Sequence, residues 1–278
     1  MLWFAYDGTI HGDWVSHYAI RLALHLGQER IPIIHIDDGA AHGDLEERLH
    51  LLEDRCRVVA LEPEVLRRPA GRPVAQQLAD LVPPGRDSYL VCGTRGRQGK
   101  RGFLTGTVPE NLLRAGLWQV LAVRVVNPGV LGQPRRVLMP LPAVRPDPGA
   151  ELPFLRPLTP ELKALHLLTV AEVPRRTFRN LPHGESQRLM RHGAETLRQQ
   201  EQALRVGLDL SAVKVETRVV VSDDVTKEIL IAANQFSAQL IYLAASPRNL
   251  TQRFFYGNPM EQLLRQAPCD VAIYKGLP

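Results

Sequence analysis

The sequence predicts an α/β protein made of two tandem copies of one parallel-sheet domain. Short apolar runs alternate with amphipathic helical patterns, and this alternation is typical of a parallel sheet with helices on both faces. The alternation resumes after residue 134, and a segment that begins at Gly106 matches one that begins at Gly257. We therefore expect doubly wound domains of the Rossmann-like or flavodoxin-like kind over residues 1–127 and 135–278, joined by a linker over residues 128–134.

The first half alternates predicted strands with predicted helices. Apolar or aromatic runs predict buried strands at residues 2–6, 31–36, 56–61, 88–92 and 118–126. Apolar residues at helical spacing predict helices near residues 14–26, 43–54, 73–81 and 108–115. Gly27 is a suitable stop for the first helix, and Pro73 suits the first turn of the third. Right-handed crossovers between parallel strands then determine most of the topology.

The second half repeats this order with one weak point. We expect strands at residues 136–140, 162–170, 213–221, 239–244 and 271–274, and helices at 185–206, at 225–233 and after 257. The stretch from Pro140 to Pro160 is rich in proline. It makes a poor first helix, because proline lacks the N–H group that a helix interior needs.

The clearest internal match lies near the ends of the two halves. Gly106-Thr-Val-Pro-Glu-Asn-Leu-Leu-Arg114 aligns with Gly257-Asn-Pro-Met-Glu-Gln-Leu-Leu-Arg265, and Val120 and Val271 follow at the same offset. In both copies a Thr or Asn stands three residues before a Glu, the arrangement of a capping box. A repeat this long indicates two domains rather than a solenoid.

A glycine-rich, basic segment follows the predicted fourth strand. It runs from Gly93 through Gly96 and Gly106 to Thr107, where a helix begins. Glycine lets the backbone turn tightly and bring its N–H groups close to an anion. The helix start adds unpaired N–H groups and the positive end of the helix dipole. The segment therefore predicts a phosphate-binding turn.

Two other residues, Asp7 and Ile36, are expected to lie beside this phosphate-binding turn. Asp7 ends the first predicted strand and Ile36 the second, so both would lie at the sheet edge where Gly93 follows the fourth strand. The second copy has lost these features. Aligned on Gly257, the positions of Asp7, Gly93, Gly96 and Thr107 hold Pro142, Ala244, Pro247 and Asn258.

Composition and charge exclude several other classes of protein. Hydrophobic residues make up 45% of the chain and charged residues 23%, as in globular proteins, and no apolar run is long enough to cross a membrane. The N-terminus lacks the basic residues of a signal peptide. The net charge of +5 comes from scattered arginines without interleaved aromatic residues, so we expect no nucleic acid and no membrane as partner. The three cysteines form neither a metal spacing nor a disulfide framework, which favours a cytoplasmic protein.

These motifs together resemble the universal stress protein family. The second half resembles the same domain in degenerate form, so the whole chain is similar to a tandem universal stress protein. The family implies a five-stranded parallel sheet in the order 3-2-1-4-5 in each domain, and pairing of domains through their fifth strands. The likeness rests on Gly93-x2-Gly96-x9-Gly106-Thr107 for the ATP-binding signature, on Phe4-Ala-Tyr-Asp7-Gly8-Thr9 for the first strand and turn, and on His35-Ile36-Asp37 for the end of the second strand.

The resemblance also implies an ATP site, with or without Mg²⁺, in the first domain only. Ala5 and Asp7 would line the adenosine side, and Asp7 would take a ribose hydroxyl or hold a metal through water. The backbone of Ile36 would meet adenine, while Cys92 and Gly93 would pass beside the ribose and first phosphate. The phosphates would be held by backbone N–H groups and one hydroxyl, from Gly96, Gly106, Thr107 and Val108.

Other sites fit these residues less well. The pattern of a Walker loop fails at Thr94 and Arg101, which stand where it needs Gly and Ser or Thr. A dinucleotide fingerprint follows a first strand rather than a fourth. We expect His35 to be structural, and His11 and His17 have no Cys or carboxylate at ligand spacing, so no direct metal site is predicted.

The sequence therefore predicts a cytoplasmic stress-response protein that binds ATP as a regulatory ligand. ATP would order the loop and change a surface that an unidentified protein partner reads. Two alternatives stay open. A slow ATP hydrolase of the adenine-nucleotide α-hydrolase-like group needs a base and a metal-holding carboxylate, and the signature region offers only Asp7. A nucleotide-free scaffold would pair its two domains as an internal pseudo-dimer through residues 120–125 and 271–274, and the chain would then form a homodimer.

Overall fold

A computed structural model of the chain describes residues 1–37, 44–69, 71–94, 103–104, 107–142, 152–245 and 259–277. The strands of the first half are β1 (Leu2–Tyr6), β2 (Arg30–Ile36), β3 (Glu62–Arg68), β4 (Gly85–Gly93) and β5 (Trp118–Arg124). Its helices are α1 (Ile10–His25), α2 (Leu45–Val58), α3 (Val74–Leu81) and α4 (Val108–Ala115), followed by the short 3-10 helix η1 (Pro128–Val130).

The second half has the same kinds of elements. Its strands are β6 (Arg136–Pro140), β7 (Ala164–Glu172), β8 (Lys214–Ser222), β9 (Leu240–Ala244) and β10 (Asp270–Lys275). Its helices are α5 (Leu152–Leu158), η3 (Thr159–Glu161), α6 (Arg175–Phe178), α7 (His183–Gly207), α8 (Val225–Gln235) and α10 (Pro259–Gln266).

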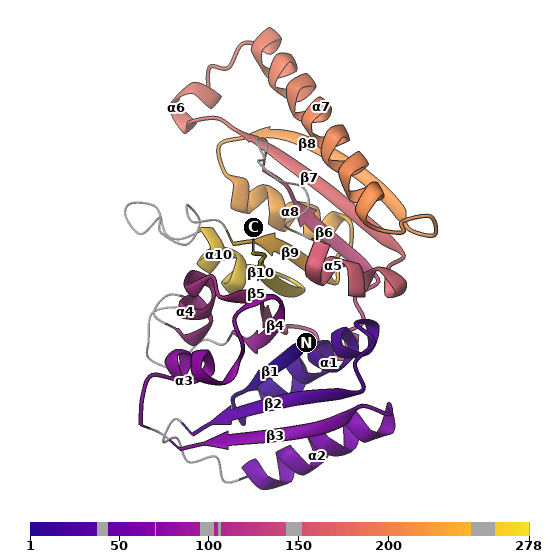
Figure 1. Cartoon of the computed structure of the whole chain (residues 1–278). Coiled ribbons are helices and arrows are strands. Elements are labelled where there is room, and N and C mark those ends of the chain that lie inside the picture. Colours follow the sequence, from indigo (N-terminus) through magenta and orange to yellow (C-terminus); the bar gives the residue numbers. More distant parts are fainter. Residues whose placement is uncertain are drawn as a thin grey trace.

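All ten strands form one continuous sheet in the order β3-β2-β1-β4-β5-β10-β9-β6-β7-β8 (Figure 1). The first half therefore has the strand order 3-2-1-4-5, and the second half has the same order running the other way from the middle of the sheet. Within each half every described pairing is parallel. The predicted fold, two tandem doubly wound units, is confirmed.

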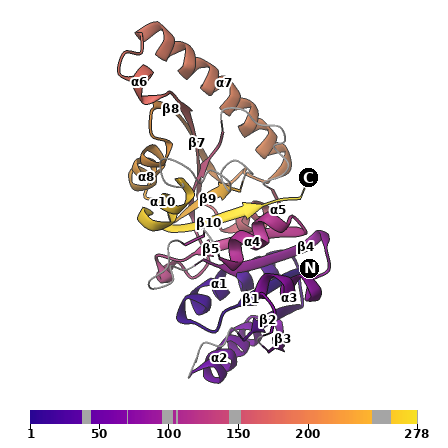
Figure 2. The ribbon, with the colours of Figure 1, turned by 90° about the vertical axis from the view of Figure 1, so that its left-hand side faces the viewer.

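Helices cover both faces of this sheet. One core cluster combines the strands with α1, α2, α5 and α7, and the other combines them with α3, α4, α8 and α10. Figure 2 shows α7 and α8 on opposite sides of the strands of the second half. Within the described part of the chain, no helix is both long enough and apolar enough to span a bilayer.

The proline-rich stretch yields a short first helix, as the sequence predicts. Helix α5 has 7 residues and contains Pro157, whereas α1, its counterpart in the first half, has 16. Proline inside a helix removes a hydrogen bond and crowds the preceding turn.

The predicted third strand at residues 56–61 is wrong, because residues 56–58 end helix α2 and residues 59–61 form the turn that follows it. Cys56 is fully buried under the sheet, but Val58 is 85% exposed, so the apolar run does not form a buried strand. Ala60 adopts a positive φ of 57°, and the N–H of Leu61 donates to the carbonyl of Cys56 at 3.0 Å. This is the turn that a glycine usually marks after a helix, and here an alanine hides the signal. The true strand, β3, lies at the sheet edge and is mostly polar.

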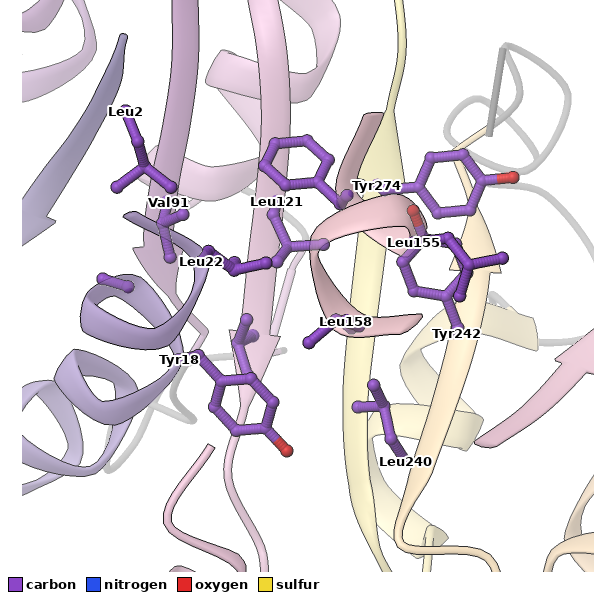
Figure 3. Close-up of a cluster of buried hydrophobic side chains, with 14 of the residues drawn as sticks. Leu2, Tyr18, Leu22, Val91, Leu121, Leu155, Leu158, Leu240, Tyr242 and Tyr274 are labelled. Atoms are coloured by element: carbon purple, nitrogen blue, oxygen red, sulfur yellow. The ribbon is translucent and has the colours of Figure 1, made fainter. Parts of the chain in front are cut away.

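The two halves meet at β5 and β10, which pair antiparallel, with Val123 opposite Ala272. Both strands are buried along almost their whole length. One core cluster crosses this junction, because it contains Leu22 and Leu121 from the first half and Leu155 from the second (Figure 3). We call this junction, the β5–β10 pairing and the side chains that pack over it, the seam.

The buried carboxylate of Asp270 connects the two halves at the seam through hydrogen bonds. Asp270 begins β10 and is fully buried. One of its oxygens accepts the hydroxyl of Tyr18 at 2.6 Å, and the other accepts the N–H groups of Val126 and Asn127 at 2.8 Å each. All three donors belong to the chain before η1, so a single side chain of the second half ties α1 to the segment after β5. Burial raises the pKa of Asp270, and the hydrogen bonds offset this rise in part.

This raised pKa predicts how the stability of the seam depends on pH. A carboxyl whose pKa is raised by folding stabilises the fold while it is protonated, and this contribution is lost as pH rises through the folded pKa. Asp270→Asn keeps an acceptor for the two N–H groups but cannot ionise. As pH rises above about 4, the ordinary pKa of an Asp side chain, the free energy of unfolding of this variant should therefore rise relative to that of the wild type. Urea titrations across this range measure the difference, and a difference that falls with rising pH would contradict the assignment.

Candidate functional site

The sheet register brings the predicted adenosine-lining residues to one edge. Ala5 on β1 pairs with Ile34 on one side and with Cys92 on the other. Ile36 lies two residues further along β2, and Gly93 lies one residue further along β4. Asp7, Gly93 and the end of β2 therefore occupy the same carboxyl edge.

The side chains of three of the predicted residues also lie on one face of the sheet. Ala5, Ile36 and Cys92 pack in the cluster that contains α3 and α4, together with Val108 at the start of α4. Since each parallel strand is followed by a crossover, α4 begins at the edge where β4 ends. Gly96 and Gly106, the other two glycines of the predicted signature, lie outside the described residues.

Asp7 is held in a fixed geometry by the turn that follows β1. One of its carboxylate oxygens accepts the N–H of Thr9 at 3.1 Å and the hydroxyl of Thr9 at 2.7 Å. Gly8 between them has a φ of 73°, a left-handed conformation that favours glycine. Thr9 in turn caps α1, with its hydroxyl oxygen accepting the N–H of Gly12 at 3.3 Å. The half-buried Asp7 is therefore an oriented acceptor rather than a freely moving base.

Gly12, which the sequence analysis did not single out, supplies the space for this carboxylate. A Cβ at this position would lie 2.5 Å from an oxygen of Asp7 and 2.9 Å from the ring of Tyr6. Any larger residue would therefore move Asp7 or the ring. The signal in the sequence is weak: a glycine in the first turns of a helix, where alanine would stabilise the helix more.

Cys92 is a buried, unreactive wall of the site. Its side chain is 3% exposed, and burial, with a smaller contribution from the nearby Asp7 charge, raises its pKa to about 12.

Thr94 follows Gly93 at the same carboxyl edge of the sheet. Thr94 donates its N–H to the carbonyl of Val123 at 2.8 Å. Its hydroxyl, although buried, has no hydrogen-bond partner among the residues that the structure describes. A buried hydroxyl without a partner calls for an explanation, such as a bound water or ligand, and sequence reasoning missed it because its burial is a tertiary property.

The start of α4 is preorganised for an anion. Thr107 is the N-cap, and its hydroxyl oxygen accepts the N–H of Glu110 at 3.5 Å. The Thr107 hydroxyl also donates to the carbonyl of Leu104, and the Thr107 N–H donates to the same carbonyl at 3.1 Å. The first N–H groups of a helix have no partner within it and point toward the positive end of its dipole. Both donors of Thr107 are therefore engaged with Leu104, Pro109 has no N–H, and the Glu110 N–H is capped, so Val108 supplies the N–H that this helix start can offer a phosphate.

The second half has the same backbone but different side chains at this edge. Leu138 pairs with Ile241 as Trp3 pairs with Leu90, so the two sheets align at constant offsets. At these offsets Ala244 replaces Gly93, and Pro142 replaces Asp7. The carbonyl of Pro142 accepts the side-chain amide of Gln200 from α7 at 3.1 Å, a contact that packs the helix onto the loop. The carboxylate of the first half is therefore missing here, while Pro247 and Asn258 lie outside the described residues.

Other parts of the described structure are weaker candidates for a functional site. Among the described residues, no group of three His, Cys, Asp or Glu side chains can hold a metal ion. His35 is buried, and its Nδ1 lies 3.1 Å from the carbonyl of Tyr6, so it serves the structure. A groove of about 340 Å³ lies between α8 and α10 of the second half. It is open, with mixed polar and aliphatic walls, and all the residues that line it belong to the second half.

Comparisons with known proteins agree with this fold. The model of the universal stress protein family matches residues 161–275, which lie in the second half. The curated proteins give no match to the sequence. Among solved structures, the chain is similar to a universal stress protein from Archaeoglobus fulgidus DSM 4304, with a TM-score of 0.61 and 17% identity over 99% of this chain and 96% of that chain.

Two further structures show the same arrangement along their length. A functionally unknown protein from Pseudomonas aeruginosa PAO1 gives a TM-score of 0.58 with 14% identity, covering 99% of this chain and 92% of that one. The cytoplasmic domain of a prokaryotic cation chloride cotransporter gives 0.61 with 12% identity, covering 99% and 95%. At these identities the likeness concerns the fold, and function has to be argued from the site itself.

The space around Gly12 gives a direct test of the site geometry. Gly12→Ala places a methyl group against Asp7 and Tyr6, so we expect it to lower the free energy of unfolding by about 1–3 kcal/mol. Gly184→Ala in α7 is the matched control, because a Cβ there meets nothing within 4 Å. That control should be neutral or should stabilise the protein by up to about 1 kcal/mol. Urea unfolding of both variants measures the effect, and equal stabilities would show that Gly12 is not needed to seat Asp7.

Proposed function

We propose that this chain, which contains a universal stress protein domain at residues 161–275, binds ATP at the carboxyl edge of its first half. ATP, with or without Mg²⁺, would act as a regulatory ligand in a stress response. The proposal also divides the chain into a nucleotide-binding domain at residues 1–127, a linker at 128–134 and a second domain at 135–278 that does not bind ATP in this way.

One observation carries this proposal: an oriented carboxylate and a capped helix start lie at the same carboxyl end of a parallel sheet. Asp7 lies at the end of β1 with its position fixed by Thr9. Thr107 caps α4, which begins on the same edge after β4. An acceptor suits a ribose hydroxyl, and helix N–H groups suit phosphates. In α/β sheets, ligands bind at this edge near the switch in strand order, which here lies between β1 and β4.

Each predicted residue has a role in this arrangement. Ala5 and Asp7 line the adenosine side, and the backbone of Ile36 meets the adenine edge. Cys92 and Gly93 pass beside the ribose and the first phosphate, and the Thr94 hydroxyl joins them as an extra donor or acceptor. The phosphates are held by Gly96, Gly106, Thr107 and Val108, of which the first two lie outside the described residues.

The geometry favours a regulatory ligand over a substrate. Asp7 already accepts two hydrogen bonds from Thr9, so it is a fixed acceptor rather than a base that removes a proton from water. Binding would instead select one arrangement of the segment between β4 and α4 and present it to a partner protein.

The thiols are compatible with a cytoplasmic protein. The three cysteines are free and buried, and burial raises the pKa of Cys56, Cys92 and Cys269 to about 12 each. Such thiols remain protonated near neutral pH and make no disulfide framework.

Calorimetric titration with ATP and Mg²⁺ tests the proposal. The wild type should bind, and Asp7→Ala should weaken binding about tenfold or more, since a hydrogen bond from the ribose to a charged acceptor is lost. Asp209→Ala is a closely matched control. Asp209 accepts the N–H and hydroxyl of Ser211 at 3.1 and 2.7 Å, the same two distances as for Asp7 and Thr9, but it is exposed in the second half.

The control variant should therefore bind ATP like the wild type. Absence of binding at millimolar ATP would reject the proposal and leave the scaffold that the seam supports. Release of phosphate that depends on Asp7 would instead favour the slow hydrolase.

A further inference from the structure

A side chain of the second half reaches the loop that precedes α4 in the first half. Glu261 lies in the first turn of α10. Its Oε2 accepts the N–H of Phe103 at 2.7 Å, and its Oε1 accepts the N–H of Leu104 at 2.7 Å. Hydrogen bonds to a carboxylate are stronger than those between neutral groups, and the two-pronged geometry also fixes the orientation of the backbone.

The side chains of the same two loop residues are held as well. The guanidinium of Arg124, on β5, lies 4.7 Å from the centre of the Phe103 ring. The guanidinium of Arg265, one helical turn after Glu261 on α10, lies 6.0 Å from it. Leu104 is 1% exposed and packs in the cluster of α3 and α4. Glu261 and Arg265 thus fix this pair of residues from the other side of the seam.

The contact continues from Leu104 to the proposed phosphate donors. The carbonyl of Leu104 accepts both the N–H and the hydroxyl of Thr107. Thr107 caps α4, and Val108 is the first residue of that helix. Hydrogen bonds through Leu104 and Thr107 therefore connect the Glu261 carboxylate to the start of α4.

We propose that Glu261 is a positioning residue for the nucleotide site of the first half, a claim that rests on the proposed function. Its carboxylate holds Phe103 and Leu104, and through the Leu104 carbonyl it holds Thr107, so that the start of α4 faces the phosphates. The second half, which lacks the Asp7 carboxylate and Gly93, thereby contributes to the site without holding the ligand. Because coupling between binding events is reciprocal, ATP should also tighten the contact of Glu261 with the loop.

Glu261→Gln tests this role with little change in shape. A glutamine offers one acceptor oxygen, and its amide N–H₂ group faces one of the two backbone N–H groups. We expect ATP to bind about tenfold or more weakly to this variant, a loss that corresponds to about one charge-assisted hydrogen bond. In the full-length protein without ATP, the amides of Phe103 and Leu104 should exchange their hydrogens faster than in the wild type.

Tyr18→Phe separates positioning from general support of the seam. It removes the hydrogen bond from Tyr18 to Asp270 at the seam and touches neither Phe103 nor Leu104. If Glu261 acts only by stabilising the seam, both variants should lose affinity in proportion to their loss of stability. A positioning role predicts that Tyr18→Phe binds ATP like the wild type even where its midpoint of urea unfolding falls as far as that of Glu261→Gln.

The outcomes distinguish the two proposals. Wild-type binding together with weak binding and fast exchange in Glu261→Gln supports the positioning role. Equal affinity of wild type and Glu261→Gln overturns it and leaves the proposed function in place. Absence of ATP binding by the wild type rejects the proposed function and the coupling with it.

Discussion

The antiparallel pairing of β5 with β10 is the constraint on which the rest of the structure depends. It converts two five-stranded sheets into one continuous sheet and removes an exposed edge from each. Asp270 adds hydrogen bonds from Tyr18 and from the chain after β5, in a place where unpaired donors would be costly. The same pairing brings α10 beside the loop before α4, and this proximity lets Glu261 reach Phe103 and Leu104.

The two halves share one fold but differ in the side chains at the carboxyl edge of the sheet. Both have the strand order 3-2-1-4-5, and they align at constant offsets through Trp3 with Leu90 and Leu138 with Ile241. The family model matches residues 161–275, in the half that lacks the Asp7 carboxylate, so that match by itself says nothing of the residues proposed to bind the nucleotide. Packing requires apolar strands and amphipathic helices in both halves, whereas a nucleotide requires its acceptor and donors once. The second half is therefore free to act as a support.

Apolar periodicity was sufficient to predict most of the fold, because buried strands and one-sided helices leave a strong pattern in a sequence. Periodicity fails at residues 56–61, because an apolar helix end without a glycine stop resembles a short buried strand. It also fails at β3, because a strand at the edge of the sheet can consist mostly of polar residues. The strand order came from family resemblance rather than from periodicity. The carboxyl-edge positions of Asp7, Ile36 and Gly93 followed from strand ends alone. Gly12, Thr94 and Glu261 could not be predicted, since their roles depend on distances between segments far apart in the chain.

The central claim is that a chain with two copies of this fold holds a single adenine nucleotide, in its first half. Native mass spectrometry of the intact protein, titrated with ATP, counts the bound ligands directly. The account predicts saturation at one nucleotide per chain, and loss of that species in Thr107→Val, which removes the hydroxyl that caps α4. Saturation at two nucleotides per chain, or one that persists unchanged in Thr107→Val, would contradict it.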